Sequence, residues 1–287
     1  MNAAPGAAHE ETVEEARAAH RAETERLGGP GEPVAEVRDA RVGEIPVRLL
    51  RPEGEGPLPV VAYLHGGGWM TGDLDTYDAP MRALANASGA IVAGVDYRRI
   101  PEHRFPAALE DTLAAIRWLA GRADEVDGSR LAVAGDSAGG NLAAVAARRL
   151  RDEVPLRLQA LVYPVTDAGL DTPSCREFHQ GYGLSVAKMR WFWDVYLDGA
   201  DGTHPDASPL RAADLAGVAP AFVVTAENDV LRDEGEAYAR ALQEVGVPCE
   251  LERWPGTIHG FWRWLVATPA AHDAIARVGA ELRRALA

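Results

Sequence analysis

Short apolar runs alternate along the chain with longer stretches in which apolar and polar residues recur at helical spacing. The first two runs, residues 34–42 and 45–51, lie on either side of Gly43 and predict a hairpin of two strands. The later runs are too short for helices, and most are bounded by glycine or proline, as expected for buried parallel strands. They cover residues 60–64, 90–95, 131–134, 158–163, 221–225 and 249–254.

The amphipathic stretches between these runs predict helices. They cover residues 79–87, 107–120, 141–151, 234–245 and 271–285. Strands that alternate with helices indicate the α/β class, with a mostly parallel central sheet and helices on both of its faces. Ligands bind such sheets beyond the carboxyl ends of the strands, so we expect the chemistry in the loops that follow the apolar runs.

Two segments interrupt this alternation. Residues 10–27 form a charged, alanine-rich helix candidate, which the sequence GGPG at residues 28–31 would end. Residues 169–209 separate two strands and contain an aromatic cluster within residues 178–197. Ordinary core packing explains such a cluster as well as a helical lid with an apolar underside over a pocket does.

The composition of the 287-residue chain narrows the classes of protein to which it can belong. Its 47% of hydrophobic and 25% of charged residues allow a buried core and argue against disorder. A formal net charge of −14 argues against nucleic acid or an anionic membrane surface as a partner. The two cysteines, Cys175 and Cys249, have no metal-ligand spacing and make no disulfide framework. Without a long apolar run or a signal-peptide pattern, the sequence predicts a cytoplasmic protein that does not insert into membranes.

The strongest chemical motif is GDSAG at residues 135–139, which has the pattern GxSxG. It lies between a predicted strand and a predicted helix, and the small residues beside Ser137 allow a tight turn that presents the hydroxyl at the helix N-terminus. A serine in an ordinary glycine-rich turn is the alternative. The strand–turn–helix context favours a nucleophile.

A second motif, HGGG at residues 65–68, follows the run 60–64. Attack on an ester carbonyl creates an oxyanion, which backbone N–H groups must already face, and glycines let the backbone approach closely. A flexible glycine turn would explain this motif alone, but both motifs together favour an oxyanion hole. We expect the amides of Gly67, Gly68 and Ala138 to form it, and His65 to hold the loop by a hydrogen bond.

A serine nucleophile needs a base, and the base needs a carboxylate to orient it. His259 follows the last predicted strand and is the best candidate for the base, while Asp229 follows the run 221–225 at the correct end. Glu227 and Asp233 are alternative carboxylates, whose other roles would be a loop hydrogen bond and a helix N-cap. Solvent-exposed positions are expected for His9, His20, His204 and His272.

These motifs occur in the order of a known family. HGGGW, YRRIPEHRFPAALED, GDSAGGNLA, TAENDVLRDEGEAYARAL and IHGF together resemble the hormone-sensitive-lipase-like group of α/β-hydrolases, the bacterial family IV esterases. The likeness runs from about residue 34 to the C-terminus. It implies an α/β-hydrolase fold and a serine carboxylesterase with the triad Ser137, Asp229 and His259. It also implies small-molecule esters of short-to-medium acyl groups as substrates, with water and without any metal or organic cofactor.

The resemblance also implies an architecture. Residues 1–30 and 169–209 would form a two-part helical cap over a catalytic core of residues 31–168 and 210–287. Related proteins often pair through the last strand, which predicts a homodimer. The chain departs from the family at Val230, where proline usually follows the triad aspartate, and at Ile100, where alanine is common. The first departure leaves open how rigid the loop around Asp229 is.

The substrate pocket is harder to read from the sequence. Trp69 and Met70 come directly after the glycine loop and are expected to line the acyl side, with Phe178 and Tyr182 of the lid above them. Packing between cap and core would explain these four residues equally well.

Two other functions stay open. An amidase, or a deacetylase of a natural product, would use the same triad, and matched ester and amide substrates would separate them. A non-catalytic ligand-binding protein is the second alternative, because some plant hormone receptors resemble this family but lack the triad histidine. His259 argues against it, and a labelled fluorophosphonate would decide, since it reacts only with an activated serine.

Overall fold

A computed structural model describes residues 11–122 and 126–287. Its centre is an eight-stranded sheet in the order β1-β2-β4-β3-β5-β6-β7-β8. The first two strands run antiparallel to their neighbours, and all pairs from β4 to β8 are parallel. The strands are β1 Glu36–Val42, β2 Ile45–Arg51, β3 Leu58–Leu64, β4 Ile91–Val95, β5 Val126–Asp136, β6 Gln159–Val162, β7 Ala221–Asn228 and β8 Cys249–Ile258.

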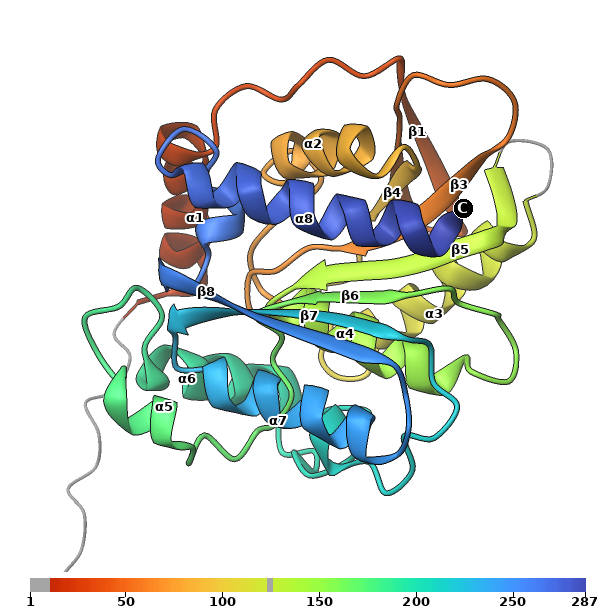
Figure 1. Cartoon of the computed structure of the whole chain (residues 1–287). Coiled ribbons are helices and arrows are strands. Elements are labelled where there is room, and N and C mark those ends of the chain that lie inside the picture. The colour runs from red at the N-terminus through yellow and green to blue at the C-terminus, as the bar shows by residue number, and fades with distance from the viewer. Residues whose placement is uncertain (1–10, 123–125) are drawn as a thin grey trace, which may run out of the picture.

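Helices cover both faces of this sheet, as the sequence predicts (Figure 1). Helices α2 and α8 pack on one face, and α3, α4 and α7 pack on the other. The helices are α1 Val13–Leu27, α2 Asp78–Ser88, α3 Ala107–Ala120, α4 Ala138–Arg149, α5 Pro173–Glu177, α6 Val186–Leu197, α7 Arg232–Glu244 and α8 Pro269–Leu286, with short 3-10 turns η1 Pro209–Arg211 and η2 Phe261–Arg263.

The two faces of the sheet make two separate hydrophobic layers. Along β3, alternate side chains enter different layers: Val60 and Leu64 pack with α4, whereas Val61 and Tyr63 pack with α2 and α8. This alternation explains why the buried strands read as continuous apolar runs, because both faces are covered. Among residues 11–122 and 126–287, no helix has the length and apolar character needed to cross a bilayer.

Three predicted boundaries move by several residues. Strand β5 begins at Val126 rather than at residue 131, and β8 continues to Ile258 rather than ending at residue 254. Helix α4 begins at Ala138, directly after Ser137, rather than at residue 141. The glycines at 139 and 140 lower helix propensity, which hides the helix start from a pattern based on residue type.

Helix α1 lies at the end of the sheet toward which β5 and β7 point (Figure 1). It begins with a capping box, in which Thr12 Oγ1 accepts from the Glu15 amide and the Glu15 carboxylate accepts from the Thr12 amide. It ends at Leu27, where the glycines predict. The first ten residues of the expected cap, with His9, lie outside the described residues.

Glu234 on α7 is the most unusual charged residue of this fold. Its side chain is buried, and one carboxylate oxygen accepts hydrogen bonds from the amides of Thr166 and Asp167, at 2.7 and 3.2 Å. Its other oxygen has no partner among the described residues. Burial raises the pKa of Glu234 to about 8, because the charged form loses its hydration.

We therefore expect stability to fall as the pH rises between 4.5 and about 8. In this window the folded state holds a proton on Glu234 that the unfolded chain has lost, which costs about 1.4 kcal/mol of unfolding free energy per pH unit. Glu234→Gln should flatten the slope, as measured by urea denaturation across this window. Glu244→Gln, at the exposed end of the same helix, should leave the slope unchanged. Equal slopes in the wild type and Glu234→Gln would contradict the expectation.

Candidate active site

The serine of the GxSxG motif lies on a sharp turn between β5 and α4. Ser137 has φ of +54° and ψ of −119°, a backbone conformation that residues other than glycine rarely adopt. The flanking glycines are required by close approach: a Cβ on Gly139 would lie 1.9 Å from the Leu64 carbonyl oxygen, and one on Gly135 would lie 2.4 Å from Gly139. The turn holds the hydroxyl away from the backbone at the start of α4.

The structure brings Ser137, His259 and Asp229 together in one hydrogen-bonded chain. Ser137 Oγ lies 2.9 Å from His259 Nε2, and His259 Nδ1 lies 2.7 Å from Asp229 Oδ2. Asp229 is buried and can only accept, so the proton of the imidazole is assigned to Nδ1 and its Nε2 lone pair faces the serine. This is the arrangement that lets a histidine take the proton of a serine.

The parallel strands explain why residues far apart in the sequence meet here. Asp229 directly follows β7 and His259 directly follows β8, and the last paired residues of these strands are Asn228 and Ile258. Two residues that follow paired positions of adjacent parallel strands emerge side by side at the carboxyl end of the sheet.

The loop that carries Asp229 is well anchored, although Val230 replaces the family's usual proline. Asp229 Oδ1 accepts from the Leu231 amide at 3.0 Å, and Val230 is fully buried. The Val230 carbonyl accepts from the Ser174 hydroxyl at 2.8 Å. These bonds fix the carboxylate without a proline ring.

The two alternative carboxylates have other partners. Glu227 accepts from the Gly256 amide at 2.7 Å, a bond that joins the ends of β7 and β8 rather than holding a loop. Asp233 is not the helix N-cap that was the alternative, because α7 begins one residue earlier and its N-cap is Leu231; Asp233 instead accepts from the Ser174 amide at 2.8 Å. The hydrogen bond of His259 therefore selects Asp229 from the three candidates.

The glycine loop after β3 lies beside the serine. Gly67 and Gly68 have φ of +108° and +60°, which glycine adopts without strain. A Cβ on Gly68 would lie 2.4 Å from the ring of Phe192 on α6, so the loop and this helix are in close contact. Ala138 begins α4, where the first amides have no acceptor within the helix. Amide donors from both motifs thus lie next to the serine.

His65 holds this loop as the sequence predicts, and Asp136 is a supporting residue that the sequence reasoning missed. His65 Nδ1 donates to the Gly66 carbonyl at 2.8 Å, while burial lowers the pKa of His65 to about 4 and keeps it neutral. Asp136 is fully buried and accepts from the Gly66 amide and from the hydroxyls of Tyr63 and Tyr77. It thereby ties the serine turn to the glycine loop. The sequence contained a sign of this role, because Asp136 is the one charged residue among the small residues of GDSAG.

A cavity of about 220 Å³ opens above Ser137 and His259. Its apolar wall comes mainly from α6 and α1, and its polar wall contains His20, Glu23 and Arg263. Arg263 is almost fully buried and pairs with Glu23, so the cavity contains a neutralised pair rather than a free cation. The lining residues of the apolar wall include Ala16, Ala19, Leu184, Met189 and Phe192.

The four residues expected to line the acyl side do not line this cavity, and that expectation is corrected. Trp69, at φ of +57°, is fully buried with its ring stacked on Tyr196 at 4.1 Å. Met70 lines a different cavity. Phe178 packs edge-on against Tyr182, and Tyr182 is 39% exposed. Trp69 thus packs against α6, and Phe178 packs within residues 169–209.

His20 also differs from expectation, because its side chain is half-buried and its Nε2 is out of contact with solvent. Its ring stacks on Tyr77 at 5.9 Å, and its Nδ1 lies 3.2 Å from Thr71 Oγ1. Burial lowers the pKa of His20 well below its usual value. His204 and His272 are exposed as expected.

Comparison with known proteins identifies the family of this chain. The family model described as the alpha/beta hydrolase fold matches residues 61–263. The chain belongs to the α/β-hydrolase family. The chain also belongs to the hormone-sensitive-lipase-like group and is a carboxylic ester hydrolase, as the motifs imply. The relatives described next confirm both points.

The relatives and the solved structure described here cover three quarters or more of the esterase. It is 43% identical to the carboxylesterase NlhH of Mycobacterium tuberculosis over 93% of this chain and 88% of that protein. It is 42% identical to the ethyl acetate hydrolase of Pseudomonas putida over 76% of this chain and 72% of that protein. The structure of EstE1, a thermostable carboxylesterase from a metagenomic library, matches with a TM-score of 0.92 and 40% identity, over 96% of this chain and 98% of that one.

Proposed function

We propose that the esterase cleaves its substrates through an acyl-enzyme on Ser137. His259 takes the proton of the hydroxyl as Oγ forms a bond to the ester carbonyl carbon, and the carbonyl oxygen becomes an oxyanion. The imidazolium then gives that proton to the leaving alcohol as the bond between carbon and the alcohol oxygen breaks. A water molecule, deprotonated by the same His259, attacks the acyl-enzyme and releases the carboxylic acid. Asp229 holds the imidazole in the required tautomer throughout.

The oxyanion would be held by the amides of Gly67, Gly68 and Ala138. Preorganised N–H donors stabilise the charge that develops in the transition state, and the loss of one donor costs about 10²–10³-fold in kcat in comparable sites. The observation that carries the proposal is the chain of hydrogen bonds from Asp229 through His259 to Ser137.

We propose short-to-medium acyl esters as the substrate class. A cavity of about 220 Å³ is small for a ligand pocket. The apolar side chains of Leu184, Met189 and Phe192 suit an uncharged acyl chain. In this proposal α1 and residues 169–209 act as the cap, because both contribute side chains to the cavity.

A fluorophosphonate probe tests the catalytic assignment directly. It should label the wild-type protein at one site, and peptide mass spectrometry should place the label on Ser137. Labelling at another serine, or none at all, would contradict the proposal. Matched ester and amide substrates then test the class of leaving group, and faster turnover of the amide would favour an amidase.

Self-association and cellular location stay predictions. Strand β8 is an edge of the sheet, and an edge strand presents unpaired backbone groups that a second copy can use. Sedimentation velocity of the wild type should then show a dimer, and a monomer at all concentrations would contradict it. A cytoplasmic location would be tested by fractionating the cells that express the protein.

A further inference from the structure

His20 lines the active-site cavity, and the proposed mechanism does not use its chemistry. It comes from α1, and its ring lies between Tyr77, on which it stacks, and Thr71, to which its Nδ1 is hydrogen-bonded. The Thr71 hydroxyl also donates to the Gly67 carbonyl at 3.1 Å. His20 Nε2 is buried and has no partner among the described residues. The imidazole is therefore held in place at one nitrogen only.

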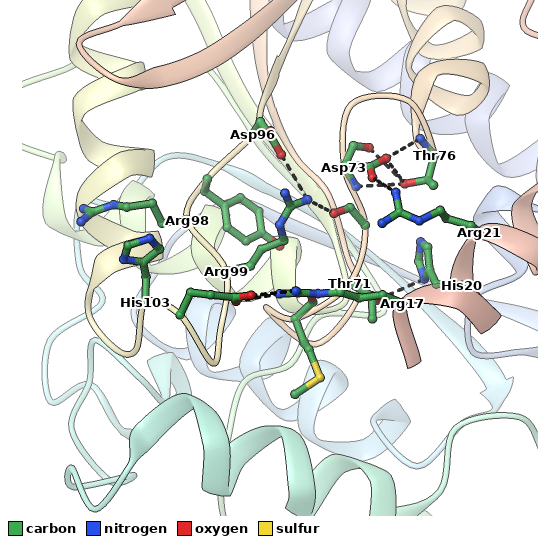
Figure 2. Close-up of a pocket in the computed structure, with 14 residues that line it drawn as sticks. Arg17, His20, Arg21, Thr71, Asp73, Thr76, Asp96, Arg98, Arg99 and His103 are labelled. Carbon is green, nitrogen blue, oxygen red and sulfur yellow. Dashed lines mark hydrogen bonds and ion pairs between the residues drawn. The ribbon is translucent and has the colours of Figure 1, made fainter. Parts of the chain in front are cut away.

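His20 also lines a second cavity, of about 340 Å³ (Figure 2). Of the described residues, only His20 and Thr71 line both this cavity and the one above Ser137. Side chains that line two cavities lie between them. The His20 ring and the Thr71 side chain thus form a partition, and the ring is its larger part.

The two cavities differ in chemistry. Four arginines and three carboxylates line the second cavity. Arg17 pairs with Glu102, and Arg98 pairs with Asp111. Figure 2 shows the side chain of Arg21 facing Asp73. Arg99 lies between Asp96 and the Gly72 carbonyl. Such a surface disfavours an uncharged chain, which would desolvate the ion pairs without replacing their hydration. A carboxylate suits this surface better, because the exposed guanidinium of Arg21 has N–H groups besides the Nη1 group that donates to Asp73.

We infer that His20 is a specificity-determining residue that closes the active-site cavity against the arginine-lined cavity. This rests on the proposed function, since it takes Ser137 as the point from which the ester extends. With the ring in place, the enzyme accepts only esters that fit the smaller cavity. With the ring removed, the joined space accepts a longer ester arm, and the favoured arm is one that ends in a carboxylate.

The test compares substrates within each variant, so that a general loss of activity cancels. Wild type and His20→Ala are assayed with p-nitrophenyl butyrate, p-nitrophenyl octanoate and the mono-p-nitrophenyl ester of suberic acid. Acetate esters of butanol, octanol and ω-hydroxyoctanoate form a second series, because either side of the ester could face His20. In one of the series, the kcat/KM ratio of the long carboxylate ester to the short ester should rise about tenfold in His20→Ala.

Two further variants test the partition and the charge. His20→Gln keeps a long side chain that can bond to Thr71, so its ratio should stay near that of the wild type. Arg21 lines only the second cavity, so Arg21→Ala alone should leave the ratio unchanged. In the double variant with His20→Ala, the gain for the carboxylate ester should shrink. Alanine favours the helix at position 20, and His20→Ser serves the same purpose if His20→Ala does not fold.

The outcomes separate this inference from the catalytic assignment. Unchanged ratios in folded His20→Ala, with Ser137 still labelled by the fluorophosphonate, would overturn the partition but leave the proposed function intact. An equal gain for the uncharged octyl or octanoyl ester would overturn the assignment of a carboxylate-binding cavity. A wild-type protein that resists the fluorophosphonate would instead overturn the proposed function itself.

Discussion

Replacing Ser137 with alanine should lower kcat for p-nitrophenyl butyrate by about 10⁶-fold, because the nucleophile disappears and only the oxyanion donors and the cavity remain. The change should leave the fold intact. The position already has a residue other than glycine at φ of +54°, so alanine adds no new backbone strain. The lost hydroxyl makes its hydrogen bond to His259, so no other element of the fold loses a contact on which it depends.

A second serine, near the other end of β5, provides the matched control. Ser129 is exposed near the start of β5, whereas Ser137 directly follows the end of that strand. Ser129→Ala should keep full activity and full fluorophosphonate labelling, while Ser137→Ala should lose both at an unchanged melting temperature. If Ser137→Ala still hydrolysed the ester at the wild-type rate, a different residue would have to be the nucleophile.

The positions of Ser137, Asp229 and His259 could be predicted because the sheet dictates them. Each follows a short apolar run, and parallel strands bring the loops after such runs to one edge. The sequence could not show the pairing of Asn228 with Ile258, which sets the two loops side by side. It also could not show how far β5 and β8 extend, because their added residues are partly exposed and polar.

The environment of His20 could not be predicted because long-range ion pairs set the position of α1. Within this helix only Ala16 is fully buried, so its residue pattern resembles that of a solvated helix. Arg17 pairs with Glu102 and Arg21 pairs with Asp73, both far away in the sequence. These contacts place the His20 ring over the core. The residue pattern within α1 does not predict them, because both partners are far away in the sequence.

The residues that line the cavity could not be predicted for a related reason. Position next to a catalytic loop says little about where a side chain points when the backbone is unusual. The positive φ of Trp69 directs its ring into a stack with Tyr196 of α6 rather than into the cavity. The apolar wall is instead made by small residues of α1 and by the underside of α6.

Replacing Asp229 with asparagine should lower kcat by roughly 10⁴-fold, although the side chain keeps its size. The two carboxylate oxygens of Asp229 have distinct partners: Oδ1 accepts from the Leu231 amide and Oδ2 accepts from His259. An asparagine would keep its carbonyl oxygen on the Leu231 amide, which needs an acceptor, and would therefore turn its NH₂ group toward His259. The imidazole would then accept at Nδ1 and carry its proton on Nε2, where it cannot take the proton of Ser137.

Because the defect is a wrong tautomer and not a missing nucleophile, the two variants should differ in a measurable way. Asp229→Asn should still be labelled by a fluorophosphonate, but much more slowly, whereas Ser137→Ala should not be labelled at any time. Glu227→Gln removes the same charge two residues earlier, near the end of β7, without touching His259, so it should keep most of its activity. An equal loss in Glu227→Gln and Asp229→Asn would mean that the local negative charge matters, and not the tautomer that Asp229 fixes.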